Sequence, residues 1–457
     1  MRSVEAQSGH GRGSRRWALI AAYLLVNGTG AARAAAQETS ATTAAPIRAL
    51  LHDDSALLGW LKEHRHEVLA ADARIAQARA DRGTAGLLLP NPQVDLTLGG
   101  LQVGAPNTVG LTKDVAAGLN FGNTANYAIG LSQTIELGKR GPRMDAADLR
   151  VQEAGKSYLD TLGDRINDAR SALARVAYLK AKMELLEDNL VGAKRVSELE
   201  KARLDHGALS GNDYDRLLLD NISLETDISR ARSDLQGALA ACQAALLAPC
   251  DAASSELVDV DSAAPIPAAV AAMTDAIEKR PDVQAVRLEA EAAKKDAVLA
   301  ERRAIPDPNV RVGFTHDTYL AGGSQPNAFQ ITLTVPLPIF DHGQHDAAKA
   351  RARALEQHHL ALGMISAARG DFSTLLSRKA FLEQTLKTLD SVAVPKSTNV
   401  LKTTSKAFDE GQVSMTDLLL ARRTHLSLVL TQMDLHFEHF SVRNDLRHTL
   451  SLDTGSR

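Results

Sequence analysis

The chain has 457 residues, enough for two or three ordinary domains, but its composition is unusual for that size. Aromatic residues make up only 4% of it, which is less than a compact enzyme normally buries and favours long, closely packed helices. The formal net charge of −3 is nearly balanced. No run rich in lysine and arginine with interleaved aromatics occurs, so the sequence argues against a nucleic-acid partner.

The N-terminus, residues 1–36, is typical of a secretory signal peptide. Arg15 and Arg16 give it a positive start, residues 17–26 form a short apolar stretch, and small residues up to Ala36 offer cleavage sites. The apolar stretch is too short to cross a membrane as a helix, and no segment of about 20 apolar residues follows it. We therefore expect an exported mature chain.

The sequence contains two cysteines, Cys242 and Cys250. In an exported protein they are equally compatible with a small-loop disulfide and with two unpaired thiols near a helix end. Neither has the spacing or the companions of a metal site. Neither lies near the cleavage site, where a lipoprotein anchor would need a cysteine.

The chain repeats itself at an offset of roughly 200 residues. Segments recur in one order in the two halves: 64–68 at 279–283, 89–94 at 305–310, 129–132 at 331–334, Gly141 at Gly343, and 207–213 at 411–417. A stretch rich in Pro, Asp, Ser and Ala joins the halves. We predict a signal peptide over 1–36, a first structural repeat over 37–247, a linker over 248–267 and a second repeat over 268–457.

Each half has the same predicted order of elements. A helical segment (about 48–88 and about 268–304) precedes two strand-like runs, a very long helical tract, a break with glycine and a further helix. The long tracts cover about 139–206 and about 342–410. At 1.5 Å per residue, a tract of about 68 residues extends roughly 100 Å. This length predicts a coiled-coil barrel or a rod.

The strand-like runs alternate apolar and polar residues, which gives each strand one apolar face. The alternation is complete in 329–337, clear in 93–98 and 310–315, and interrupted by Gln133 in 127–135. Runs of about 10 residues with one apolar face and aromatics at their ends are typical of outer-membrane strands, although a half-buried soluble sheet alternates in the same way. Four strands cannot close a barrel without open edges in lipid, so we expect several copies to share one barrel.

Together these features resemble the TolC family of outer-membrane efflux proteins over almost the whole mature chain. The resemblance rests on the duplication, the Pro-x-Pro before each first strand, the strand–turn–long-helix junctions and the Gly-x5-Asp of each hairpin tip. It implies an α+β membrane protein with a long α-helical coiled-coil barrel in the periplasm. It also implies a twelve-stranded β-barrel in the outer membrane of a Gram-negative bacterium, shared among three protomers with four strands each.

As a TolC-like protein, the chain is expected to form a homotrimer that serves as a passive exit duct without a cofactor. The implied partners are a periplasmic adaptor (membrane fusion) protein, an inner-membrane pump and outer-membrane lipid. The junction at residues 131–140 resembles the CzcC-like branch, which is associated with heavy-metal cation efflux through RND pumps. Drug efflux and type I secretion are the alternatives within the family.

A periplasmic coiled-coil adaptor or scaffold is the alternative from another class, since such proteins also use long helical hairpins. It leaves the alternating strands unexplained. An enzyme is the weakest interpretation, because the sequence has no nucleophile elbow, P-loop or dinucleotide fingerprint. We therefore predict no catalytic residues.

The hairpin tips carry the candidate site residues. Asp417 matches the aspartate of the family's periplasmic constriction, where three carboxylates around the axis would attract cations. Asp213 is its counterpart in the first half, and either aspartate could instead stabilise a helix N-terminus. Leu420 stands where better-known members carry a second carboxylate. Helix capping is expected for Gly207, Ser210, Gly411 and Ser414, and the tips as a whole are the candidate adaptor contact. Leu209 and Val413 could serve that contact or pack between helices.

Several histidines occur in close pairs, which raises the question of a metal site. The pairs are His342 and His345, His358 and His359, and His436 and His439. No third ligand accompanies any of them, and a duct gains nothing by holding its cargo tightly. We interpret them as solvated surface residues and predict no metal site.

Overall fold

The computed structural model describes residues 50, 53–99, 126–250, 274–316 and 327–453. The predicted signal peptide (1–36) and most of the predicted linker (248–267) lie outside these residues, as do most of the residues predicted to connect the strands of each pair. Within the described residues, no helix combines the length and the apolar character needed to cross a membrane.

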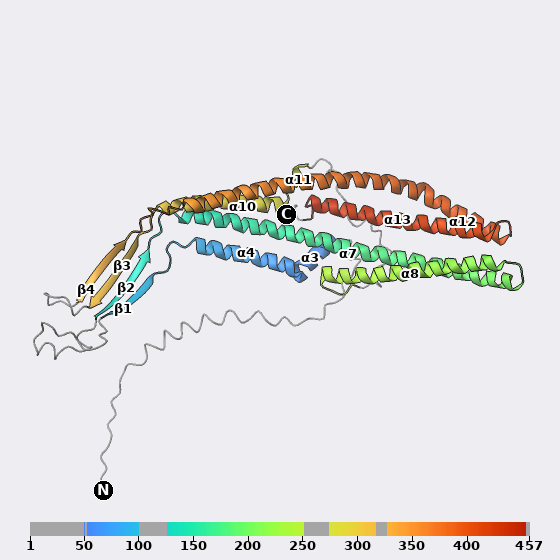
Figure 1. Ribbon diagram of the computed structural model, residues 1–457, viewed down its shortest axis with the longest axis horizontal. Helices are drawn as coiled ribbons and strands as arrows, with labels where there is room; N and C mark the ends of the chain where they lie inside the picture. Colours follow the sequence, from blue (N-terminus) through green and yellow to red (C-terminus); the bar gives the residue numbers. More distant parts are fainter. Residues whose placement is uncertain (1–49, 51–52, 100–125, 251–273, 317–326, 454–457) are drawn as a thin grey trace, which may run out of the picture. The chain divides into compact units, whose positions relative to one another are not determined.

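The two halves of the chain have the same order of elements (Figure 1). The first half contains helices α3 (Asp54–His64) and α4 (His66–Ala85), strands β1 (Gln93–Gly99) and β2 (Asn126–Thr134), and helices α7 (Arg140–Asp205) and α8 (Gly211–Leu246). The second contains α9 (Thr274–Glu278), α10 (Pro281–Glu301), η3 (Arg302–Ala304), β3 (Asn309–His316), β4 (Asn327–Thr334), α11 (Gln344–Thr388), η4 (Leu389–Ala393), α12 (Val394–Asp409) and α13 (Met415–Thr449). The predicted duplication is thus reflected in the fold.

The first long tract is confirmed, and the second requires a correction. Helix α7 has 66 residues, which corresponds to about 100 Å of uninterrupted helix. The second tract is not one α-helix, because the π-helical turn η4 separates α11 from α12. Pro395 explains the interruption: it lacks an N–H group, and its ring would clash with the carbonyl of Ser391 in a regular α-helix.

The four strands form one antiparallel sheet in the order β1-β2-β3-β4 (Figure 1). The register places the apolar residues of all four strands on one face, as the alternation predicts; Leu96, Ile129, Phe314 and Phe329 are aligned across it. Gln133 lies on this face opposite Val310, and its side-chain amide donates to the Pro90 carbonyl at 2.9 Å. The strands have seven to nine residues each, fewer than the predicted ten or so.

The long helices pack side by side in a simple succession. Helix α4 packs on α7, α7 on α10 and α10 on α11. Within the first helical hairpin, α8 packs on α7. In the second half of the chain, α13 packs on α11 and α12, and it also contacts α7. Within the first succession, α4 and α11 are the outer helices. They are also the helices that join the two outer strands, since α4 precedes β1 and α11 follows β4.

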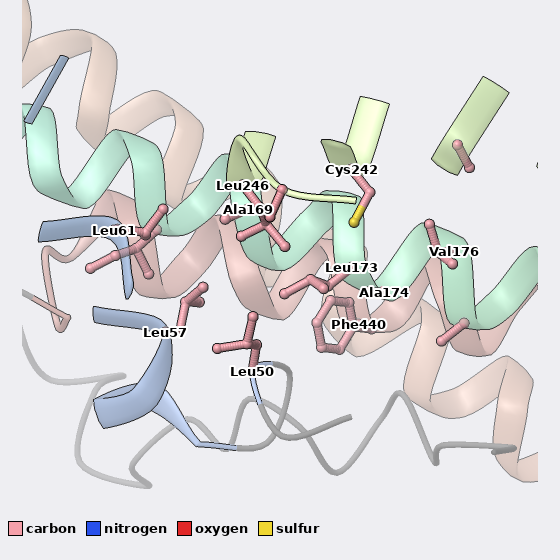
Figure 2. Close-up of a cluster of buried hydrophobic side chains, with 14 of the residues drawn as sticks. Leu50, Leu57, Leu61, Ala169, Leu173, Ala174, Val176, Cys242, Leu246 and Phe440 are labelled. Atoms are coloured by element: carbon pink, nitrogen blue, oxygen red, sulfur yellow. The ribbon is translucent and has the colours of Figure 1, made fainter. Parts of the chain in front are cut away.

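Two buried clusters hold the middle of the helices together. In the first, Leu57 and Leu61 of α3 meet Leu173 of α7, Leu246 of α8 and Phe440 of α13 (Figure 2). The second joins α9, α10, α11 and α13 through Ile277, Val283, Ile365, Ala368, Phe372, Leu382, Val442, Leu446 and Leu450. The clusters occupy corresponding places in the two halves, and α13 contributes to both.

Cys242 and Cys250 form a disulfide, which decides between the two states that the sequence leaves open. Cys242 is fully buried in the first cluster, and the bond ties the end of α8 to the chain that follows it. The bond closes a loop with a sequence separation of 8 residues. By the chain-entropy relation, closing so short a loop stabilises the fold by about 2–3 kcal/mol.

Replacement of Cys250 by serine is therefore expected to lower the free energy of unfolding by about 2–3 kcal/mol. The measurement is the unfolding temperature in detergent, with and without a reducing agent. The reductant should bring the wild type down to the level of the variant and leave the variant unchanged. An equal effect of the reductant on both proteins would contradict a stabilising disulfide.

Candidate functional site

The first hairpin tip consists of a glycine stop followed by a serine cap. Gly207 has φ +71°, and the N–H groups of Gly207 and Ala208 donate to the carbonyls of Leu204 and Arg203. This pattern is the Schellman motif, in which a left-handed glycine ends a helix. Ser210 then caps α8: its hydroxyl oxygen accepts from the Asp213 N–H at 3.1 Å.

The second tip repeats this arrangement. Gly411 has φ +73°, and the N–H groups of Gly411 and Gln412 donate to carbonyls in the last turn of α12. Ser414 and Asp417 form a complete capping box at the start of α13. The Ser414 hydroxyl accepts from the Asp417 N–H, and the Asp417 carboxylate accepts from the Ser414 N–H at 3.1 Å and hydroxyl at 2.7 Å.

The electrostatics of Asp417 follow from this capping box. The hydrogen bond from the Ser414 hydroxyl, and after it the bond from the Ser414 N–H, lower the pKa of the Asp417 carboxyl below its ordinary value. The carboxylate is thus ionised at neutral pH and solvent-exposed, while one of its oxygens is engaged at the helix N-terminus. The two roles that the sequence suggests for Asp417, helix stabilisation and an exposed negative charge, are compatible in this geometry.

An apolar cluster fills the space between the tips. Leu217 of α8 packs with Phe408, Met415, Leu418 and Leu419 of the second hairpin. Val413 and Val196 are partly buried against the same cluster, so Val413 packs between helices. Leu209, which is also partly buried, is not among the residues of this cluster. Leu420 projects into solvent with an exposed fraction of 64%.

The polar contacts between the hairpins include two that join α8 to α13, and sequence reasoning missed both. Arg216 of α8 donates to the Thr416 hydroxyl at 2.9 Å, and Arg423 of α13 forms an ion pair with the largely buried Asp220 of α8 at 2.5 Å. The partners are 200 and 203 residues apart in the chain. The tips have the same residue spacing in the two repeats, so residues that follow Gly207 and Gly411 lie side by side. This equal spacing was the only signal in the sequence for the two contacts.

The polar face of the sheet carries an ion pair that spans three strands. Arg311 of β3 reaches across Gly130 of β2 and donates from Nε to the Asp95 carboxylate of β1 at 2.8 Å. A Cβ atom at Gly130 would lie 2.6 Å from Arg311 Nε and 2.7 Å from the Asp95 oxygen. A side chain at this position would therefore displace the pair from its present geometry. In the described part of the strands, the apolar face carries no such pair and exposes leucine, isoleucine and phenylalanine instead.

The histidine pairs fall in different environments. The described part of the chain contains no group of three His, Cys, Asp or Glu residues that could hold a metal ion. His436 lies 3.3 Å from the Asp390 carboxylate in the π turn. His439 is buried against α11, with its Nε2 atom 3.6 Å from Glu383. The interpretation as a solvated surface residue is therefore wrong for His439, because α13 is covered by α11 at this point.

Comparison with known proteins identifies the family. The family model described as "Outer membrane efflux protein" matches residues 57–246 and 272–435, which is well over half of the chain. A search of functionally curated proteins gives no significant match.

Solved structures with the same fold include several outer-membrane channels. A crystal structure of CusC, described in terms of folding and transmembrane channel formation, matches with a TM-score of 0.73 and 15% identity over 91% of this chain and 95% of that one. VceC from Vibrio cholerae matches with a TM-score of 0.69 and 17% identity over 87% and 96% of the two chains. The open state of MtrE from Neisseria gonorrhoeae matches with a TM-score of 0.69 and 17% identity over 88% and 89%.

The family model and the fold agree with the features built up above: two repeats, a shared four-stranded sheet and paired helical hairpins. The chain belongs to the outer membrane efflux protein family, with the TolC-like fold, and is a protein of the outer membrane of a Gram-negative bacterium.

Proposed function

We propose that the chain is one protomer of a homotrimeric exit duct in a tripartite efflux system. The observation that carries this proposal is the open sheet. Among the described residues, β1 and β4 each pair with one neighbour only, and their apolar face is bare, with exposed fractions of 69% at Leu96 and 85% at Phe329. Unpaired strand edges are not tolerated in lipid, so further copies must complete the sheet.

Three copies would supply twelve strands, an even number within the range of outer-membrane barrels. The apolar face would then contact lipid, and the face with the Asp95–Arg311 pair would line a hydrated interior. The helices offer a matching wall, because α4 and α11 are the outer helices of their layer and join the outer strands. A hollow of about 950 Å³ along this layer is lined by charges of both signs, including Arg150, Glu289 and Asp296, which suits a water-filled conduit.

The entrance would lie at the hairpin tips, where Asp417 and Asp213 are the candidate constriction residues. The contacts Arg216–Thr416 and Arg423–Asp220 support this role, since they hold the two tips of one protomer together and would have to rearrange if the tips moved apart. The surrounding tip residues, Gly207 to Ser210 and Gly411 to Ser414, are the proposed contact with a periplasmic adaptor. An RND-type inner-membrane pump would supply the energy.

Heavy-metal cations are the proposed cargo. The proposal rests on the CzcC-like junction at residues 131–140 and on the exposed, ionised Asp417. Drug efflux and type I secretion are the competing cargoes, and Leu420 in place of a second carboxylate weakens any selective attraction of cations. We also propose that the mature chain consists of the repeats 37–247 and 268–457, joined by the linker 248–267 after removal of 1–36.

Single-channel conductance in a planar bilayer tests the duct and its constriction together. Wild-type protein purified in detergent is expected to give discrete conductance with a preference for cations. Asp417→Asn keeps a hydrogen-bond acceptor for the capping box but removes the charge, so the cation preference should fall. Asp213→Asn tests the other candidate, at the same position of the first tip.

The outcomes distinguish the existence of the duct from the identity of the residue at its constriction. Conductance with an unchanged cation preference in Asp417→Asn would keep the duct and remove Asp417 from the constriction. A larger effect of Asp213→Asn would transfer the constriction to the first tip. A protein that stays in solution without detergent and forms no pores would contradict the proposed duct and support the scaffold alternative.

A further inference from the structure

A groove near the tips, separate from the hollow that α4, α7 and α10 line, has the features of a ligand site. It has a volume of about 510 Å³ and runs between α7 and α12, with α13 also lining it. This size lies within the usual range of small-molecule sites. Its apolar lining comes from Val196 and Leu199 of α7, Leu401 and Phe408 of α12, and Leu418 of α13.

A buried carboxylate at the tipward end of the groove lacks part of its hydrogen bonding. Glu200 is only 3% exposed. Its Oε1 atom accepts from Arg203 at 3.0 Å, but its buried Oε2 atom has no hydrogen-bond partner among the described residues. A buried carboxylate oxygen without a donor is costly, because it loses water and gains nothing in return. The position therefore has an unfilled place for a donor.

The charges around Glu200 indicate the kind of donor. Asp409 also lines the groove. Burial raises the pKa of Glu200 above its ordinary value, the Arg203 charge lowers it in part, and the Asp409 charge raises it further. An incoming cation would relieve both the burial and the repulsion between the two carboxylates. The tipward end of the groove thus favours a positively charged donor.

The opposite end of the groove is lined by Arg422 and, beside Asn189, by Asp188. Arg422 donates from Nη2 to the Asn189 carbonyl at 3.3 Å, while its buried Nη1 atom has no hydrogen-bond partner among the described residues. Asn189 and Glu200 are about 16 Å apart along α7. An apolar chain that extends from Glu200 would meet the leucine and valine side chains between the two ends. A second ammonium group on a short chain would lose its water there without gaining a carboxylate partner.

We propose that the groove binds an amphiphilic organic monocation. Its ammonium group donates to Glu200 Oε2, and its apolar body lies along Val196, Leu199, Leu401 and Phe408. The apolar side chains along the body of the ligand select against short dications, because a second charge would be desolvated among them. The inference is independent of conduction, since binding in this groove needs no flow through a duct.

Calorimetric titration of the full chain in detergent tests the proposal, with protein-free detergent as the blank. The probes are hexylamine, hexanol and hexane-1,6-diamine. Hexylamine should bind saturably and at least about tenfold more tightly than the other two, since a charge-assisted hydrogen bond to a buried carboxylate has about this effect. Glu200→Gln should weaken hexylamine binding about tenfold or more and leave hexanol binding unchanged.

Two variants serve as controls. Glu198→Gln removes an exposed carboxylate two residues away that does not line the groove, and binding should be unaffected. Arg203→Gln frees the Glu200 carboxylate from its ion pair, so hexylamine binding should be kept or strengthened. Equal hexylamine affinity in Glu200→Gln and wild type would overturn the proposal. So would equal affinity of the wild type for hexylamine and hexanol, a result that does not depend on any variant folding.

Discussion

Replacement of Gly343 by alanine is expected to lower the free energy of unfolding by about 4 kcal/mol or more. Gly343 precedes α11 with φ +85°, a conformation that residues with a Cβ atom rarely adopt. A Cβ atom there would lie 2.0 Å from the Ala300 carbonyl oxygen and 2.9 Å from its carbon. Since both are backbone atoms at the end of α10, the clash can be relieved only by moving one helix away from the other.

Gly363→Ala is the matched control for this prediction. Gly363 is exposed in the interior of α11, and a Cβ atom there meets nothing within 4 Å. Alanine should stabilise that helix by up to about 1 kcal/mol. Unfolding temperatures in detergent and the yield of assembled protein measure both effects. Similar stability of the two variants would show that α10 and α11 can move apart at little energetic cost. The close approach of Gly343 to Ala300 would then be unimportant for stability.

Asp453→Ala is expected to cost about 3–5 kcal/mol of stability, because it leaves two buried guanidinium groups without their shared carboxylate. The Asp453 carboxylate accepts from Arg170, which is 1% exposed, at 3.0 Å and also pairs with Arg447. Asn444 adds a hydrogen bond, accepting from Arg170 at 3.0 Å. This network joins the end of the chain to the middle of α7. Chemical unfolding of the purified protein measures the loss.

The same network predicts a dependence on pH. Burial acts to raise the pKa of Asp453, but the hydrogen bond and charge of Arg170, with Arg447, outweigh it and lower the pKa below its ordinary value. A carboxyl with a lowered pKa stabilises the fold above its unfolded pKa, and this contribution is lost as the pH falls through the folded pKa. Asp453→Asn should therefore remove part of the acid sensitivity.

An exposed ion pair provides the contrast. Lys406 and Glu410 lie 3.9 Å apart on the surface of α12, and Glu410→Gln should change stability by less than about 0.5 kcal/mol. If Asp453→Ala lowered the free energy of unfolding as little as Glu410→Gln, water could replace the Asp453 carboxylate in the buried network. The structural role assigned to the end of the chain would then be wrong.

Local signals in the sequence were sufficient for the strands and the hairpin tips. Alternation in residues 329–337 identifies the apolar face of β4 directly, because side chains of a strand point to its two faces in turn. Gly207 and Gly411 mark the helix ends, and Ser210 and Ser414 mark the next helix starts, since glycine and serine suit these positions for local reasons.

Features that depend on distant partners could not be predicted. Arg170 and Asp453 are 283 residues apart, and nothing in either segment announces the pairing. The burial of His439 depends on how α11 covers α13, and the buried, half-satisfied Glu200 looks like any helix-surface glutamate in the sequence. The π turn at η4 was visible in principle through Pro395, but the strong helical pattern on both sides of it concealed the interruption.

The open edges of the sheet also have consequences for the assembly of the protein and for the genetic effect of mutant copies. Each chain must meet partners before its strands are complete, so the rate of assembly depends on the amount of chain present and lags when expression is low. In the proposed trimer, a copy with a damaged edge strand would disrupt every barrel that it joins. With equal amounts of intact and damaged chains, only about one assembly in eight would contain three intact copies, so such mutations should act dominantly.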